Sequence, residues 1–138
     1  MTQEFQYDIY MICPVRNATL EEIGLLKEYR DKFTKKGKTV CYPAESTNQN
    51  DTTGGYQICE DHCNEIHCSD EVHVYWNPDS SGSYVDLGTA FPNHFVHGRN
   101  IQLINRNTVE EMVDQHKNNG VTKSYEHVLL KLDNLAKL

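Results

Sequence analysis

The hydrophobic positions of this chain follow two alternating spacings. Short runs of aliphatic, β-branched and aromatic residues predict buried strands at residues 7–13, 38–42, 72–76 and 100–105. Between and after these runs, apolar residues recur every three or four positions, which is typical of helices with one buried face. Such helices are predicted over residues 20–36, 56–69 and 83–97, from residue 108 onward, and over residues 122–138.

This alternation of strand and helix indicates the fold class. Parallel strands joined by right-handed helical crossovers give a sheet that is covered by helices on both faces. We therefore predict an α/β fold, a three-layer sandwich with a four- or five-stranded, mainly parallel sheet of the flavodoxin or Rossmann-like kind. The sequence has no internal repeat and no long linker, so residues 1–138 are expected to form a single domain.

Local sequence signals refine the ends of these elements. Thr19 and Thr108 each open the pattern T-x-x-E, a capping box that predicts a helix start. The polar segment 44–55 is rich in helix-breaking residues and predicts a loop, which is the best candidate in the chain for a lid over a ligand. The loop after the third strand, residues 77–82, carries a dense turn signal before the next helix.

Charge and cysteine content narrow the classes of function. The 138 residues carry a formal net charge of −7, which argues against a nucleic acid polymer as partner, because phosphate backbones need a basic surface. No apolar run reaches the length of a membrane span, and the first residues lack the pattern of a signal peptide, so no membrane partner is expected. The odd number of cysteines, five, favours free thiols in the cytoplasm over a disulfide framework.

One predicted helix carries a pattern that a metal site would also show. Cys59, Cys63 and His67 recur at four-residue spacing on one helical face. Zinc sites usually draw ligands from more than one element and include close Cys-x-x-Cys pairs, and this run has none. Half-buried cysteines that pack the helix are the favoured interpretation, and we expect neither a metal nor another cofactor.

Three loops are predicted to meet at the carboxyl ends of the strands, where ligands bind in open α/β sheets. Arg16 supplies a cation suited to phosphate or carboxylate. The helix start near residue 83 offers hydroxyls and free N–H groups to an anion, and Asp86 adds a carboxylate close by. Capping, loop and core roles are the alternatives for these residues. The expected substrate-binding residues are Tyr10, Cys13, Arg16, Asn77, Ser80, Gly82 and Ser83.

The same stretches carry a family resemblance. The sequences ICPVR at residues 12–16, SDEVHVYWNPDSSGS at 69–83 and DLGTAF at 86–91 resemble the nucleoside 2-deoxyribosyltransferase family, whose superfamily includes nucleoside 5'-monophosphate N-glycosidases. The family motif S/D-x-G-x-x-x-E-x-G-x-A aligns with residues 80–90, which puts Asp86 at the position of the nucleophilic glutamate. The resemblance implies attack on the anomeric carbon of a sugar, with the glycosyl-enzyme resolved by a second base or by water. It also implies a homo-oligomer.

The resemblance assigns further roles and exposes two departures. Ser80 and Arg16 fall where the monophosphate N-glycosidases contact phosphate, which favours a nucleotide and hydrolysis. Asp86 is one methylene shorter than the family's glutamate. The family's helper aspartate on the preceding helix is replaced by His62, with Asp61 beside it. Helical neighbours point about 100° apart, so only one of these two faces the site, and His62 could act as the acid because its pKa lies near neutrality.

We therefore predict cleavage of an N-glycosidic bond, or deoxyribosyl transfer, through a carboxylate nucleophile, with a small-molecule nucleoside or nucleotide as the partner. The alternative is a non-catalytic protein that binds a nucleotide-derived ligand in the same pocket. The short carboxylate at position 86 motivates that alternative. Cleavage of NAD at its glycosidic bond is a third candidate.

Overall fold

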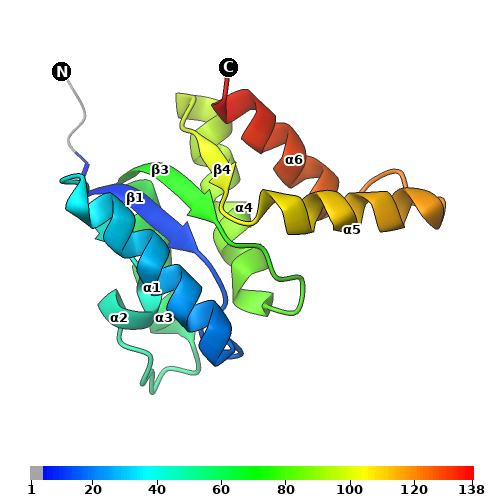
Figure 1. Cartoon of the computed structure of the whole chain (residues 1–138). Coiled ribbons are helices and arrows are strands. Elements are labelled where there is room, and N and C mark those ends of the chain that lie inside the picture. The colour runs from blue at the N-terminus through cyan, green and yellow to red at the C-terminus, as the bar shows by residue number, and fades with distance from the viewer. Residues whose placement is uncertain (1–4) are drawn as a thin grey trace.

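A four-stranded sheet in which neighbouring strands run parallel forms the centre of the molecule, as seen in a computed structural model that describes residues 5–138 (Figure 1). Its strand order is β2-β1-β3-β4, which confirms the predicted α/β fold with a parallel sheet. The order reverses between the two central strands, β1 and β3, and this switch point is where open α/β sheets bind ligands. The strands are β1 (Tyr7–Ile12), β2 (Val40–Cys41), β3 (Ser69–Val74) and β4 (Ile101–Leu103).

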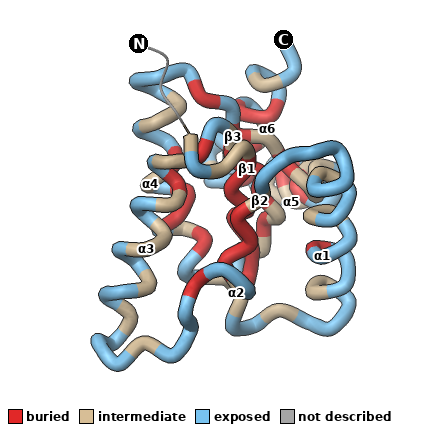
Figure 2. Tube along the Cα trace, turned by 90° about the vertical axis from the view of Figure 1, so that its left-hand side faces the viewer, coloured by how far each residue is buried: buried red, intermediate tan, exposed pale blue. Residues whose placement is uncertain are grey.

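Helices cover both faces of the sheet and form the outer layers of the sandwich (Figures 1 and 2). One face carries α1, and the other carries α3 and α4, while α6 packs against the edge strand β4 and α5 packs against α6. The helices are α1 (Leu20–Lys35), α2 (Pro43–Ser46), α3 (Tyr56–His67), α4 (Ser81–His97), α5 (Arg106–Asn118) and α6 (Tyr125–Ala136). Within residues 5–138 no helix combines the length and apolar character needed to cross a bilayer.

The central strand β1 shows how the sequence divides the core between the two faces. Successive side chains of a strand point to opposite faces of its sheet. Ile9 and Met11 pack with Leu26 of α1, while Tyr10 and Ile12 belong to the cluster beneath α3 and α4. The buried part of the chain therefore follows the strands (Figure 2), and the hydroxyl of Tyr10 is directed toward the α3–α4 side.

One of the two predicted capping boxes is present and the other is wrong. The hydroxyl of Thr19 accepts from the backbone N–H of Glu22, and the Glu22 carboxylate accepts from the N–H of Thr19, both at 3.1 Å. Thr108 lies inside α5, which begins two residues earlier, at Arg106. The Arg106 guanidinium donates to Asp133 of α6 at 2.6 Å. The first residue of this helix therefore makes a contact to α6 that the local sequence pattern could not predict.

The third strand also departs from its prediction over residues 72–76. β3 begins at Ser69 because its polar first residues pair with β1, Tyr7 lying opposite Ser69. It ends at Val74 because Trp76 leaves the ladder, and its N–H donates to the side-chain oxygen of Asn105 at 2.8 Å. Strand pairing and one side-chain amide thus outweigh the β propensity of the sequence.

Smaller corrections concern the segment after β2 and the last helix. The predicted loop 44–55 includes most of the single-turn helix α2, which starts with Pro43 at its first position, where a missing N–H costs nothing. The last helix was predicted from residue 122 but begins after Ser124, whose hydroxyl accepts from the N–H of His127. These changes leave the predicted layers intact.

Candidate functional site

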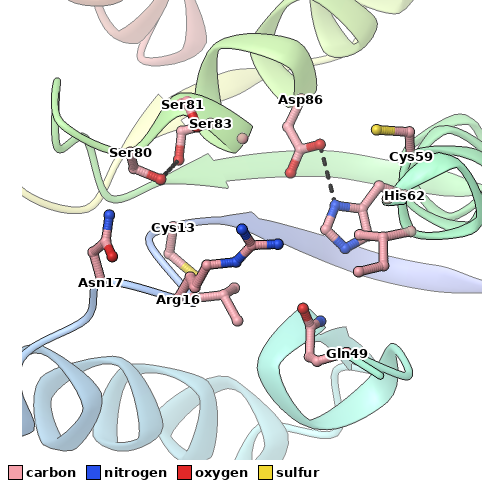
Figure 3. Close-up of a pocket in the computed structure, with 14 residues that line it drawn as sticks. Cys13, Arg16, Asn17, Gln49, Cys59, His62, Ser80, Ser81, Ser83 and Asp86 are labelled. Atoms are coloured by element: carbon pink, nitrogen blue, oxygen red, sulfur yellow. Dashed lines mark hydrogen bonds and ion pairs between the residues drawn. The ribbon is translucent and has the colours of Figure 1, made fainter. Parts of the chain in front are cut away.

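A pocket of about 280 Å³ lies at the carboxyl edge of the sheet, beside the ends of β1 and β3 (Figure 3). The loop after β1, the segment from α2 into α3, and the start of α4 surround it. Its lining residues are Cys13, Val15, Arg16, Asn17, Gln49, Gly55, Ile58, Cys59, His62, Ser80, Ser81, Gly82, Ser83 and Asp86. Segments that are distant in the sequence therefore meet at the edge where the sequence predicted a site.

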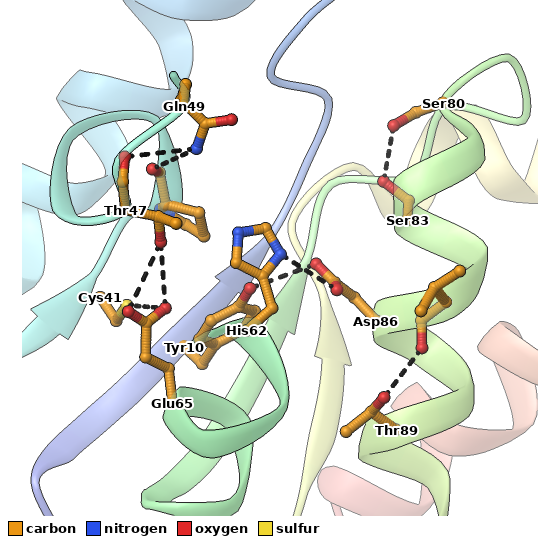
Figure 4. Close-up of polar contacts among 12 residues, drawn as sticks. Tyr10, Cys41, Thr47, Gln49, His62, Glu65, Ser80, Ser83, Asp86 and Thr89 are labelled. Atoms are coloured by element: carbon orange, nitrogen blue, oxygen red, sulfur yellow. Dashed lines mark hydrogen bonds and ion pairs between the residues drawn. The ribbon is translucent and has the colours of Figure 1, made fainter. Parts of the chain in front are cut away.

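Asp86 on α4 stands at the centre of the polar contacts of this pocket (Figure 4). Its residue exposure is only 7 %. One carboxylate oxygen lies 3.2 Å from Nδ1 of His62 on α3, and the other accepts a hydrogen bond of 3.2 Å from the hydroxyl of Tyr10 on β1. Because two neighbouring elements fix both of its oxygens, the Asp86 carboxylate has a set orientation toward the pocket.

His62 lines the pocket and contacts the Asp86 carboxylate. Burial opposes the charged form of His62, but the hydrogen bond and the negative charge of Asp86 outweigh it, so its pKa is raised above the ordinary value of 6.5. Nε2 of His62 is shielded from solvent and has no hydrogen-bond partner among the described residues. With Nδ1 directed at the carboxylate, Nε2 is the nitrogen that remains for a ligand or a transferred proton.

Tyr10 is an uncharged hydrogen-bond donor to the Asp86 carboxylate. Burial and the adjacent negative charge of Asp86 raise the pKa of its phenol well above 10. The side chain does not line the pocket, and its residue is fully buried. Tyr10 therefore contacts Asp86 and lies outside the pocket lining, and its substrate-binding role stays a prediction.

The opposite end of the pocket is suited to an anion. The first turn of α4 begins there, and its N-cap Ser80 makes no side-chain hydrogen bond to a helix N–H. The hydroxyls of Ser80 and Ser83 instead contact each other at 2.9 Å. Unsatisfied helix N–H groups and the positive end of the helix dipole attract negative charge. The exposed guanidinium of Arg16 points into the same pocket (Figure 3).

Two cysteines line the pocket in different environments. Cys13 is buried, and burial together with the Asp86 charge raises its thiol pKa above the ordinary value, so it contributes an uncharged wall. Cys59 on α3 is exposed, as is Cys63 one turn further along. The prediction that the cysteines of this helix pack half-buried is therefore wrong for these two residues. All five thiols are free.

Besides Tyr10, two predicted site residues do not line the pocket. Asp61 precedes His62 by one helical position, and its carboxylate accepts from the Gln57 amide at 2.9 Å on the outer side of α3. The side-chain oxygen of Asn77 accepts from the N–H of Asp79 at 2.9 Å, so that amide shapes the turn before α4. Helical rotation and local turn geometry, respectively, account for these two positions.

Sequence reasoning also missed part of the lining. Asn17 follows Arg16, and Gln49 lies on the segment that was predicted as a lid, but neither was singled out. Ile58 and Cys59 lie four and three residues before His62 on α3, so helical spacing from His62 could have found them. Within residues 5–138 no group of three or more histidine, cysteine, aspartate or glutamate side chains is arranged to hold a metal ion.

Comparison of the sequence with models of known protein families and with curated proteins finds no match. The resemblance to nucleoside deoxyribosyltransferases stays a prediction that rests on the residues of the motif. The geometry of the pocket supplies the independent physical argument.

Proposed function

We propose that this protein binds a nucleoside monophosphate and cleaves its N-glycosidic bond, with Asp86 as the nucleophile. One observation carries the proposal. Asp86 pairs with His62 in a pocket, and the start of α4 lies at the other end of the same pocket. An acid–base pair and an anion cradle within one small cavity match the two ends of a nucleotide, the reacting sugar and the phosphate. The motif resemblance at residues 80–90 supports the same assignment.

The reaction follows from the contacts of the two side chains. A carboxylate oxygen of Asp86 forms a bond to the anomeric carbon as the bond from that carbon to the base nitrogen breaks. The leaving base takes the Nε2 proton of the His62 imidazolium. Water then attacks the anomeric carbon, its proton returns to His62, and Asp86 is released together with the free sugar phosphate. A carboxylate suits the oxocarbenium-like transition state, as in glycoside hydrolysis, and attack by a second base in place of water would give deoxyribosyl transfer.

The size of the pocket bears on the substrate. A volume of about 280 Å³ lies just below the range of about 300–1,000 Å³ for small-molecule sites. This favours a mononucleotide over NAD, which carries a second nucleotide. Arg16 and the hydroxyls of Ser80 and Ser83 are the phosphate contacts in this proposal. Five free thiols support a reducing compartment such as the cytoplasm.

The proposal is tested by incubating the protein with pooled ribo- and deoxyribonucleoside monophosphates and separating the products by chromatography. Free base and sugar phosphate in equal amounts are expected. Adding a second, labelled base distinguishes transfer, which incorporates the label, from hydrolysis, which does not. Absence of free base from every nucleotide of the pool would contradict the proposed activity.

A non-catalytic binding protein is the second candidate, and one observation favours it. Asp86 is almost buried and both of its oxygens are already engaged, while an aspartate reaches less far than a glutamate. A misplacement of about 1 Å can cost on the order of a hundredfold in rate. Calorimetry with the same nucleotides discriminates the two candidates, because a binding protein gives saturable heat and returns its ligand unchanged.

A homo-oligomer is part of the proposal and has its own support. α4 exposes several apolar side chains on its outer side, including Phe95 at 79 % and Val96 at 69 %. Contiguous exposed apolar residues are typical of association surfaces. Sedimentation equilibrium tests this, with a Phe95→Glu substitution expected to shift a dimer toward monomer. A monomer at all concentrations in the unaltered protein would contradict it.

A further inference from the structure

The side-chain amide of Gln49 is held in one orientation at the rim of the pocket. Its nitrogen donates to the backbone oxygen of Pro43 at 3.0 Å and to that of Thr47 at 3.4 Å (Figure 4). Only the amide nitrogen can donate to carbonyl oxygens, so this network assigns which end of the amide is which. The amide oxygen of Gln49 is thereby left as a hydrogen-bond acceptor on a residue that lines the pocket.

The segment that carries Gln49 is itself anchored. Thr47 is buried, and its hydroxyl donates to the carboxylate of Glu65 on α3 at 3.2 Å. The thiol of Cys41 at the end of β2 contacts the same carboxylate at 3.4 Å. Thr47 thus joins the segment to α3, and the hydroxyl of Ser46, 3.2 Å from the Cys41 thiol, joins it to β2. The Gln49 amide therefore sits on a fixed support in spite of the polar sequence around it.

Gln49 and His62 occupy the same end of the pocket, away from Ser80 and Ser83 (Figure 3). In a nucleotide the base and the phosphate lie on opposite sides of the sugar. If phosphate binds at the start of α4, the base lies toward Gln49 and His62. That end then carries an acceptor, the Gln49 oxygen, and Nε2 of His62, which is a donor when the ring is charged.

We propose that this end of the pocket selects nucleobases that carry an exocyclic amino group next to a ring nitrogen. The amino group donates to the Gln49 oxygen while the ring nitrogen accepts from Nε2 of His62. Adenine and cytosine present such an edge. Hypoxanthine and uracil place a carbonyl oxygen where the amino group stands, and two acceptors then face each other. The inference rests on the proposed nucleotide site and adds the chemical class of its base.

Selectivity requires that Gln49 cannot simply rotate its amide to suit a carbonyl. Rotation by half a turn would direct the amide oxygen at the carbonyl oxygens of Pro43 and Thr47 and so lose both hydrogen bonds. Gln49 is exposed, and an oxo base would place a second acceptor opposite its amide oxygen, so that no hydrogen bond forms between them. The fixed amide therefore discriminates between amino and oxo bases by about tenfold.

The test measures binding and base release for matched pairs that differ only in this group: dAMP with dIMP, and dCMP with dUMP. The unaltered protein is expected to favour the amino member of each pair by about tenfold. Gln49→Met, which removes the acceptor, is expected to bring each pair within about twofold. Asn50→Met is the control, because Asn50 lies on the same segment but does not line the pocket, and it is expected to keep the preference.

The outcomes separate this inference from the proposed function. Binding of all four nucleotides with no preference, or a preference that survives Gln49→Met, would overturn the base assignment and leave the nucleotide site in place. A preference for the oxo members would overturn it as well. Failure of all four to bind would contradict the proposed function itself. Circular dichroism of Gln49→Met checks that the segment stays folded, and Gln49→Ala, which also removes the acceptor and is expected to bring each pair within about twofold, is the second variant if Gln49→Met does not fold.

Discussion

Two histidines lie on opposite faces of the sheet, one half-buried and one buried, and they differ in what surrounds them. His73 on β3 faces α1 and is 1 % exposed. Its Nδ1 lies 2.7 Å from the Tyr29 hydroxyl and its Nε2 lies 2.8 Å from the amide nitrogen of Gln102. His62 on α3 has one nitrogen at Asp86 and the other without a partner, next to a pocket.

The electrostatic consequences are opposite. Burial lowers the pKa of His73, with Glu71 opposing that shift only in part, so the ring stays neutral and both nitrogens serve the fold. Asp86 raises the pKa of His62 against the effect of burial. Burial alone therefore does not distinguish a structural histidine from a chemical one. Both rings have a carboxylate nearby, Glu71 for His73 and Asp86 for His62. The distinction is that Asp86 outweighs the effect of burial on the His62 pKa, and that the fold leaves one nitrogen of His62 unused.

The largest expected effect concerns Asp86. Asp86→Asn keeps the shape of the side chain but removes the nucleophilic charge, so base release is expected to fall by about a thousandfold or more. Chromatographic rates on the best nucleotide of the pool measure this. Because an amide can still accept from Tyr10, the circular dichroism spectrum should be unchanged. A rate within tenfold of the unaltered protein would show that another group attacks the sugar.

The second largest effect is expected at His62, and His73 provides the matched control. His62→Gln removes the proposed acid and is expected to slow base release by about a hundredfold. His73→Gln, the matched change on the opposite face, should leave the rate within about twofold. It should instead lower the free energy of unfolding by about 1–3 kcal/mol, because it breaks a buried hydrogen-bond network. Rates and urea unfolding of both variants measure these effects, and the comparison fails if the two changes slow the reaction equally.

The pH dependence of the two histidines should also run in opposite directions. The folded pKa of His62 is raised, so its contribution to stability is complete below the ordinary value of 6.5 and is lost as pH rises through the folded pKa. The folded pKa of His73 is lowered, so the unfolded chain binds a proton that the folded chain does not, and stability is lost as pH falls below 6.5. Titration of the ring protons by NMR should find His62 above 6.5 and His73 below it. The reverse order would contradict both assignments.

The smallest effect is expected at the phosphate end. Arg16 is exposed, so its charge is screened and Arg16→Met should raise KM for a nucleoside monophosphate by about tenfold with little change in kcat. The corresponding nucleoside without phosphate should show no such change. Lys27→Met, an exposed cation outside this pocket, is the control. An equal effect of Arg16→Met on both substrates would place Arg16 away from the phosphate.

Much of the fold and the site could be predicted from the sequence because the signals are local. The periodicity of apolar residues predicted every helix layer, and the motif around Asp86 led to the pocket. Arg106 at the start of α5 contacts Asp133, and Trp76 after the end of β3 contacts Asn105, and such distant contacts leave no local trace in the sequence. Gln49 escaped notice for the same reason, because its role depends on carbonyl groups that only the folded segment brings to it.

The most direct test of the account measures base release in parallel for the unaltered protein, Asp86→Asn and His73→Gln at equal concentrations of folded protein. The account predicts free base from the unaltered protein and from His73→Gln at similar rates, and none above background from Asp86→Asn. No base from any of the three, or equal rates from all of them, would contradict the claim that the pocket at Asp86 and His62 is a catalytic site.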